Sequence, residues 1–291
     1  MRSQLWAYGA PGRQNATMYV DSLKEVHGEI SENSYSYDDA GQLRIATDPS
    51  GVETHYLYDD IGRQVGVVDA AGYLTEFVYS KTNQLLQTIR YANPLSSLQM
   101  ASLTDLDGEP ADISLDEGLR PQHDYASDRT IRTLYDAADR PVYTIDEEFY
   151  VTRHFYDGSG QLTDVIGYST PLDLLDVIAL DEASTASDLD FLILASAEDR
   201  HSRMFYSPNG EMIAELDAEG FLKEYFYDAI GRQTESVGYA YQLNFDSNLH
   251  SSGDLDSIRQ QIINNDMAAN GGVAGSADIH SYLSLIHISE P

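Results

Sequence analysis

The sequence contains no cysteine, which excludes a disulfide framework and a thiolate metal site. It is also poor in basic residues: 17 Lys and Arg stand against 48 Asp and Glu, which gives a formal net charge of −31. Binding a phosphate backbone requires clusters of Lys and Arg, so we expect no nucleic-acid partner and no anionic membrane partner. The simplest interpretation of the acidity is solubility or a salt-adapted source, and it leaves cations and basic partners allowed.

Long apolar runs are missing as well. No stretch of 18 apolar residues occurs, so we expect no membrane span. The first thirty residues show no basic region followed by an apolar one, so no signal peptide is visible, although Met1 need not be the natural start.

Motifs that carry chemistry are equally scarce. The eight histidines are scattered, without His-x-x-x-His or a comparable ligand spacing. A Gly-x-Ser-x-Gly elbow is absent, and Gly158-Ser159-Gly160 belongs to a turn rather than to a phosphate-binding loop. Carboxylates are so plentiful that an acid–base pair can be chosen anywhere, so none counts as a signal. The sequence therefore predicts no catalytic residue, no metal ligand and no cofactor-binding residue.

What the sequence has in abundance is tyrosine, at 21 residues, and the tyrosines recur at a fixed spacing. A Tyr followed by Asp or Ser returns every 21 residues within three blocks. A second turn, Asp-x-x-Gly, falls between successive copies at Asp48, Asp69 and Asp217. Seven copies of one spacing indicate an architecture rather than a chemistry. The seven tyrosines are Tyr37, Tyr58 and Tyr79, then Tyr135 and Tyr156, then Tyr206 and Tyr227.

The residues around each copy predict antiparallel hairpins. In the best copy Thr54, Tyr56 and Tyr58 share one face of a strand, and His55 and Leu57 share the other. The two kinds of turn alternate along the chain with only one short strand between them, and such short connections make neighbouring strands antiparallel. The Tyr-Asp turns then fall on one edge of the sheet and the plain Asp-x-x-Gly turns on the other. The tyrosines should form a ladder along every second strand.

Each residue type of the motif has a structural role. The turn Asp accepts hydrogen bonds from backbone N–H groups further on. Gly at the fourth position supplies a positive φ. The Arg after the turn pairs with the Asp or stacks on a Tyr. The residues to which we assign these roles are Tyr37, Asp38, Gly41, Tyr58, Asp59, Gly62, Arg63, Asp69, Gly72, Tyr135, Asp136, Arg140, Tyr156, Asp157, Gly160, Tyr206, Gly210, Tyr227, Asp228, Gly231 and Arg232.

A larger period is superimposed on the hairpins. Tyr58, Tyr135 and Tyr206 recur at a longer spacing. The second motif Tyr and the last Tyr of each block recur at the same longer spacing. The larger unit is therefore two hairpin repeats plus one partly helical insert. Such arrays bury each unit against its neighbours, and without a polar cap at either end this one is expected to be a slice of a longer array. The repeat blocks are 31–92, 128–169 and 199–240, and the inserts are 93–127, 170–198 and 241–282, the last of which includes the start of a truncated repeat. Segment 1–30 is poorly patterned, and we interpret it as the tail of an earlier unit. Segment 283–291 resembles a translated sequencing adapter.

The inserts carry helix signals. Asn93-Pro94 predicts an N-cap and a first helical position, with Leu95, Leu98 and Leu103 facing the sheet. Thr170-Pro171 predicts a second start, followed by a short helix that includes Leu172, Leu175 and Val177-Ile178. In the third insert we expect a helix over Leu255–Ile263.

The pattern Tyr-x-Tyr-Asp-x-x-Gly-Arg, followed by Asp-x-x-Gly-x-x-Thr, closely resembles the RHS/YD repeat. The best copies are His55–Arg63 with Asp69–Thr75, and Glu224–Arg232. The resemblance covers the three repeat blocks, about half of the chain. Ser80 and Ser207 replace Asp, and Asn83 and Asp139 replace Gly, which leaves strand pairing near the inserts undetermined.

The resemblance implies a mainly β fold: an antiparallel β-hairpin repeat sheet, curved as a shell segment, with short helical inserts between repeat pairs. The family includes bacterial polymorphic toxins, insecticidal toxin-complex components and animal teneurins, and its shell typically encloses a C-terminal toxic domain. An aspartyl self-cleavage centre can end such a shell. Asp48-Pro49-Ser50-Gly51 resembles that end region, but it lies on the ordinary turn register and we interpret it as a turn. The sequence contains no toxin domain.

Two functions follow from this resemblance. The first is a non-catalytic structural segment of an RHS-repeat shell in a large, secreted or surface-delivered bacterial protein. That segment would pair with further repeats of the same longer chain and enclose or present an effector outside this fragment. The alternative is a carbohydrate- or cell-surface-binding module that uses exposed Tyr ladders. Buried Tyr rows favour the wall, and exposed rows favour the binding module. An enzyme would need a convergent polar cluster, for which we find no candidate.

Calcium is the only ligand ion that the sequence brings into consideration. The turn Asp rows offer hard oxygen ligands, as do Asp105, Asp107 and Glu109 in the first insert. Asp105-x-Asp107-Gly108-Glu109 lacks the remaining EF-hand positions, so we assign no ligand residue.

Overall fold

The computed structural model describes residues 32–111, 113–115, 118–181, 184–239, 242–243 and 254–269. The expected tail at 1–30, the truncated repeat near 278–282 and the adapter-like segment 283–291 lie outside the described residues.

Fourteen strands form one sheet in which spatial order follows chain order, and every neighbouring pair is antiparallel. The expected fold class, a mainly β sheet of antiparallel hairpin repeats, is therefore confirmed. The strands are β1 Ser34–Tyr37, β2 Leu43–Thr47, β3 Glu53–Tyr58, β4 Gln64–Val68, β5 Leu74–Tyr79, β6 Leu85–Arg90, β7 Arg129–Tyr135, β8 Pro141–Ile145, β9 Val151–Tyr156, β10 Leu162–Gly167, β11 Arg200–Tyr206, β12 Met212–Leu216, β13 Leu222–Tyr227 and β14 Gln233–Gly238.

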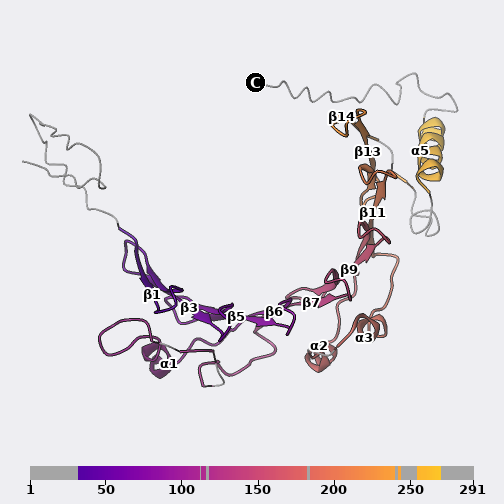
Figure 1. Cartoon of the computed structure of the whole chain (residues 1–291). Coiled ribbons are helices and arrows are strands. Elements are labelled where there is room, and N and C mark those ends of the chain that lie inside the picture. Colours follow the sequence, from indigo (N-terminus) through magenta and orange to yellow (C-terminus); the bar gives the residue numbers. More distant parts are fainter. Residues whose placement is uncertain are drawn as a thin grey trace, which may run out of the picture.

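The sheet bends into an open arc, and the helices of the inserts lie along its outer side (Figure 1). We call this covered side the convex face and the opposite side the concave face. None of the helices in the described residues is long and apolar enough to cross a bilayer. The helices are α1 Ser97–Ala101, α2 Leu174–Ala179, α3 Ala186–Asp190 and α5 Leu255–Ala269.

The sheet continues across the inserts. Strand β6 pairs with β7 although the first insert separates them in sequence, with Gln87 opposite Arg132. Strand β10 pairs with β11 in the same way, with Asp164 opposite Arg203. The replacements of motif residues next to the inserts therefore do not interrupt the pairing.

The two kinds of turn differ in register. Every hairpin closed by a Tyr-Asp or Tyr-Ser turn contains a register shift next to the turn, as between Leu57 and Tyr58, whereas the hairpins closed by plain turns are regular. A bulge inserts one residue into one strand, bends it and increases the local twist. Because all seven bulges lie on one edge, they bend the sheet repeatedly in one sense, which explains the arc.

The hydrophobic core is divided into three clusters, each between the convex face and one insert. In the first cluster Leu57 and Leu74 from the strands pack with Leu95, Leu103 and Leu119 from the insert. A single-layer sheet has no other layer on this side, so each insert supplies the burial that its own strands need. We refer to β3–β6, β7–β10 and β11–β14, each with the insert that follows, as units one, two and three.

The starts of the inserts differ from the sequence expectation. Asn93-Pro94 and Thr170-Pro171 do not begin helices; α1 is capped by Ser96, through a capping box with Gln99, and α2 begins after Asp173. The chain leaves the last strand of each unit extended, because its backbone is tied to the plain turn of the same unit. The N–H of Leu95 donates to the carbonyl of Gly72 at 2.8 Å.

The same tie recurs in the other units. Leu172 donates to Phe149 at 3.0 Å, and Leu243 donates to Gly220 at 2.8 Å. This delay rotates the helices relative to the expectation. Leu98, predicted to face the sheet, is 83% exposed, and Leu175 in the second insert is 78% exposed.

The other expected contacts of the inserts are present. Leu95, Leu103, Leu172 and Val177 are buried, as expected. The helix expected over Leu255–Ile263 is the first part of α5, where Ile258 and Ile262 are buried against unit three.

The turn glycines give a prediction with an internal control. Gly51 has φ +81° and open space around a Cβ, so Gly51→Ala should cost about 1–2 kcal/mol of unfolding free energy through backbone strain alone. In Gly220→Ala the new Cβ would lie 2.9 Å from the Leu243 carbonyl oxygen, so the cost should be larger. Gly158 has no positive φ and no neighbour within 4 Å of a Cβ, so Gly158→Ala should change stability by less than about 0.5 kcal/mol.

Urea unfolding followed by circular dichroism of the three variants measures this order. Equal losses at Gly51 and Gly158 would contradict the left-handed turn position.

Candidate functional site

The Tyr-Asp turns form the first group of motif side chains. At Asp59, Oδ1 accepts hydrogen bonds from the N–H groups of Ile61 at 3.2 Å and Arg63 at 2.8 Å. The other carboxylate oxygen accepts from Arg63 Nε at 2.7 Å. Asp136 with Arg140 and Asp228 with Arg232 repeat this arrangement. One Asp thus closes its own turn and fixes the direction of the Arg that follows.

The Arg then reaches the next repeat. The guanidinium of Arg63 lies 4.8 Å from the ring centroid of Tyr79, and that of Arg140 lies 4.6 Å from the ring of Tyr156. Both contacts have cation–π geometry. Adjacent repeats are therefore linked along this edge by side chains as well as by the strand ladder.

The tyrosine hydroxyls donate hydrogen bonds to backbone carbonyl groups. Tyr156 donates to the carbonyl of Pro141 at 3.0 Å, on the neighbouring strand. Tyr135, Tyr206 and Tyr227 do the same to the carbonyls of Leu85, Leu162 and Met212. These four tyrosines are only partly exposed, so the ladder lies within the wall. Tyr37, on β1, is 57% exposed.

The remaining motif residues occupy the turns in the same way. Asp38, Asp69 and Asp157 each accept from a backbone N–H four residues on. Ser80 and Ser207 replace Asp through their hydroxyls, at 3.1 and 3.2 Å from that N–H. The motif glycines with positive φ are Gly41, Gly62, Gly72, Gly160, Gly210 and Gly231.

Three residues other than Gly also have positive φ. Asn83 and Asp139 were expected there, and Phe149, at φ 70°, was not. Phe149 packs against the core of unit two, which offsets the strain of the left-handed backbone.

Hydrogen bonding keeps the turn carboxylates ionised. The Arg140 side chain and the backbone N–H groups of the turn hold the pKa of Asp136 below its usual range. The pKa of Asp228 is lowered by the Arg232 backbone N–H and then by its side chain. At Asp59 desolvation opposes the shift, but the bonds from Arg63 and Ile61 outweigh it and the pKa falls.

The acidic segment considered for calcium is another turn of the same kind. Asp105 Oδ1 accepts from the N–H groups of Asp107 and Glu109, and Gly108 has φ +83°. In the described part of the chain, no group of three or more His, Asp or Glu side chains is placed to hold a metal ion. Calcium binding stays a prediction.

A second group of polar side chains is buried on the convex face, where the inserts dock. Glu76 on β5 is 4% exposed and accepts a hydrogen bond from the Tyr91 hydroxyl at 2.7 Å. Arg120 of the first insert donates to Glu76 Oε1 through Nε at 3.0 Å and Nη2 at 2.8 Å, and its Nε also lies 3.1 Å from Oε2. A forked pair of this kind fixes orientation as well as distance. It therefore fixes where the first insert lies on the sheet.

Unit three repeats this anchor. Glu224 on β13 is 3% exposed and accepts from the Tyr239 hydroxyl and from Arg259 of α5, whose Nε lies at 2.7 Å. Burial, followed by the adjacent carboxylate, raises the pKa of both Tyr91 and Tyr239. Both tyrosines are thus neutral hydrogen-bond donors.

Unit two has a pair of reversed polarity at this position, and it is more exposed: the side chains of Arg153 and Asp190 are 30% and 42% exposed. The strand residue is Arg153 and the insert residue is Asp190, at the end of α3, with Arg153 Nη1 2.9 Å from Asp190 Oδ1. Glu76, Arg153 and Glu224 each stand three places before the second motif Tyr of their unit, so they occupy one position of the larger repeat. Each insert therefore matches the charge of its own unit.

Sequence reasoning missed these anchors. The signal that could have found them is a charged residue at one fixed position of the larger repeat, on a strand face that is otherwise apolar. The partners of these charged residues lie in the inserts, which share no motif. The spacing of residues in the sequence therefore could not show which insert residue pairs with which strand residue.

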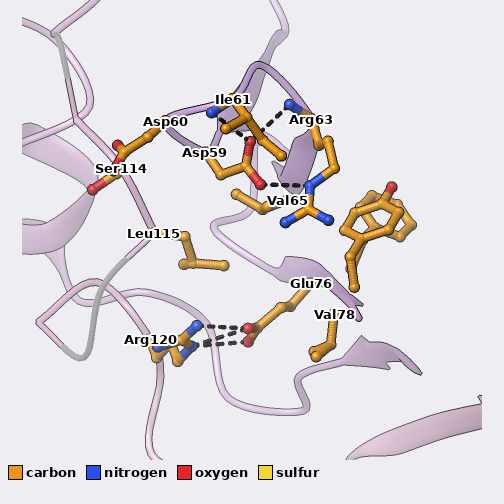
Figure 2. Close-up of a pocket in the computed structure, with 12 residues that line it drawn as sticks. Asp59, Asp60, Ile61, Arg63, Val65, Glu76, Val78, Ser114, Leu115 and Arg120 are labelled. Atoms are coloured by element: carbon orange, nitrogen blue, oxygen red, sulfur yellow. Dashed lines mark hydrogen bonds and ion pairs between the residues drawn. The ribbon is translucent and has the colours of Figure 1, made fainter. Parts of the chain in front are cut away.

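A cavity of about 470 Å³ lies between the first insert and the Tyr-Asp turns (Figure 2). Figure 2 shows Arg63 paired with Asp59 on one wall and Arg120 paired with Glu76 on another. Val65, Val78 and Leu115 also line it. Both of these guanidinium groups are already paired, and the cavity lies at the junction between insert and sheet.

The charge reversal between units gives a second prediction. Glu76→Arg alone places two guanidinium groups together, and Arg120→Asp alone places two carboxylates together, so each should cost about 2–4 kcal/mol. The double variant recreates the polarity of unit two and should recover at least half of that loss. Urea unfolding of the four proteins of the cycle gives the coupling energy. Additive single effects would contradict a specific anchor.

Acid lability gives a third prediction. The folded pKa of Asp136 is lowered, so its contribution to stability is complete above the unfolded value of about 3.9 and is lost as pH falls through the folded value. Asp136→Asn removes the titration but keeps an oxygen for the backbone N–H groups. It should therefore show a smaller loss of stability below pH ~4 than the parent chain. Parallel acid curves for the two proteins, from thermal melts at each pH, would contradict this role.

Comparison with known proteins supports the resemblance noted from the sequence. The family model described as "RHS Repeat" matches residues 37–74. No curated protein matches the chain. Among solved structures, the chain is similar to the TcdB2–TccC3–Cdc42 complex, at 14% identity and a TM-score of 0.37, over 71% of this chain and 10% of that chain.

The chain is also similar to the Photorhabdus luminescens Tc holotoxin pore, at 15% identity and a TM-score of 0.37, over 72% of this chain and 11% of that chain. The TcdB2–TccC3 complex gives 13% identity and a TM-score of 0.34, over 72% and 11%. The chain thus spans about a tenth of the length of each of these three solved chains. Residues 37–74, which run from the first motif Tyr to the start of β5, are an RHS repeat.

Proposed function

We propose that this chain is a wall segment of an RHS-type shell in a large, secreted or surface-delivered bacterial protein. The observation that carries the proposal is the single antiparallel sheet of fourteen strands that bends in one sense and keeps its inserts on the outer side (Figure 1). An arc built from equal steps turns toward closure as steps are added, which is the geometry of a container.

The wall should continue beyond the described strands. Within the described residues β1 pairs only with β2, and β14 pairs only with β13. Open edges of a sheet are ready templates for further strands and are a hazard when left bare. Further repeats of the same longer chain are the partners that fit both edges.

The concave face is the side that would meet an enclosed or presented effector. The three core clusters pack the inserts against the other side, so the concave face keeps half-buried side chains such as Thr133, Thr144 and Thr152, which lie opposite one another across β7–β9. In unit three the equivalent positions hold Met204, Glu215 and Lys223, so the face that would meet a cargo carries long and charged side chains there. The effector itself lies outside this chain.

The binding alternative rests on exposed aromatic rings. Tyr35 and Tyr37 are 55% and 57% exposed, but both belong to β1, where a further strand would pair. Tyr73 and Tyr150, which directly follow plain turns, are 45% and 42% exposed. The other ladder hydroxyls named above donate to the backbone, which favours the wall. Glycan-array binding by the chain, with and without calcium, would support the alternative. A non-enzymatic role stays a prediction.

The direct test is electron cryomicroscopy of the protein encoded by the complete reading frame. We expect a hollow particle whose wall contains these strands in order, with α1, α2, α3 and α5 on its outer surface. Strands arranged as a flat ribbon, or inserts that face the lumen, would contradict the proposal.

A further inference from the structure

One buried cation on the convex face lacks the partner that its equivalent has in the next unit. Arg132 on β7 is 8% exposed, and its Nη1 donates to the carbonyl of Asp181 in the second insert at 3.2 Å. Its Nε has no hydrogen-bond partner among the residues that the structure describes. Desolvation lowers the pKa of this guanidinium, and a buried charge with an unused donor is costly.

The internal repeat shows what the position normally holds. Arg203 on β11 is the equivalent of Arg132, because each stands three places before the first motif Tyr of its unit. Arg203 Nε donates to Asp164 Oδ1 at 3.2 Å, and Asp164 lies directly opposite Arg203 in the β10–β11 pair. At the β6–β7 pair the residue opposite Arg132 is Gln87, which holds in unit one the place that Asp164 holds in unit two. A neutral amide thus stands where the other junction has a carboxylate.

A cavity of about 90 Å³ is present at this junction. Arg132, Gln87 and Thr130 line it from the sheet, His123 and Asp128 from the end of the first insert, and Val177 from the second. A water molecule takes up about 30 Å³ in the liquid, so the space suits an anion of three or four heavy atoms.

The charge of Asp181, which does not line the cavity, opposes the fall in the pKa of Arg132. Asp128 is the one acid among the lining residues, and its oxygens are already used. Oδ1 accepts from the Ala92 N–H at 2.8 Å, and Oδ2 accepts from His123 Nδ1 and the Asp124 N–H, both at 3.0 Å. Ile89, Phe149 and Leu174 supply apolar walls, and a charge–charge contact is stronger in such surroundings than in water.

We propose that this cavity is a binding site for a small carboxylate anion, of formate or acetate size, held by the guanidinium of Arg132. Gln87 and Thr130 line the same cavity and supply neutral donors. The bound anion takes the place that the Asp164 side chain occupies beside Arg203. The site lies where two inserts meet, so its occupancy joins units one and two.

The test follows the arginine Nε–H resonance of Arg132 by ¹⁵N-edited NMR in the full chain. Sodium formate replaces sodium chloride at constant ionic strength. We expect a saturable shift of one arginine resonance, which Arg132→Lys removes. No saturable shift, or the same shift in Arg132→Lys, would overturn the proposal and leave the cavity to water.

Gln87→Asp supplies the carboxylate from within, as Asp164 does. It should abolish the formate response and raise the thermal midpoint of the protein in chloride. Gln87→Asn, whose side chain has the length of Asp but no charge, is the matched control and should keep the formate response. A formate response that persists unchanged in Gln87→Asp would show that the anion binds elsewhere.

Discussion

One face of an open sheet has to be covered, and this constraint decides how the chain is organised. The strands alternate side chains between two faces, and the convex face is apolar enough to require a second layer. The chain provides it locally: each pair of hairpins is followed by an insert that folds back over it, as Leu95 and Leu103 do over Leu57. Stability therefore comes in units, each made of four strands and their own cover.

The two edges of the sheet have different structural roles. On the Tyr-Asp edge, bulges and the Asp–Arg–Tyr contacts set the bend and link successive repeats. On the plain edge, the turns accept the backbone of the departing insert. The anchors Glu76–Arg120 and Arg153–Asp190 carry opposite polarity, so a swapped insert would bring like charges together. Matching of inserts to units is thus part of how the wall is specified.

The repeats could be predicted from the sequence because their determinants are local. An Asp, a Gly at a left-handed position and an alternating strand follow one another directly along the chain, and the departures at Ser80 and Asn83 keep the same geometry. The inserts could be predicted only in part. Asn93-Pro94 has a helix-start signal, but the bond from Leu95 to Gly72 holds the chain extended, and Leu98 is consequently exposed. The anchors and the bulges depend on partners distant in sequence or on register, which no local pattern records.

The measurement that tests this account most directly is amide hydrogen exchange on a chain whose first insert is replaced by a short turn. Arg90 and Arg129 are register partners, so a two-residue connection can join β6 to β7 without moving either strand. We expect the amides of β3–β6 to lose their protection while those of β11–β14 keep theirs. Full protection of β3–β6 without the insert would show that the sheet is stable without its cover, and would contradict the account.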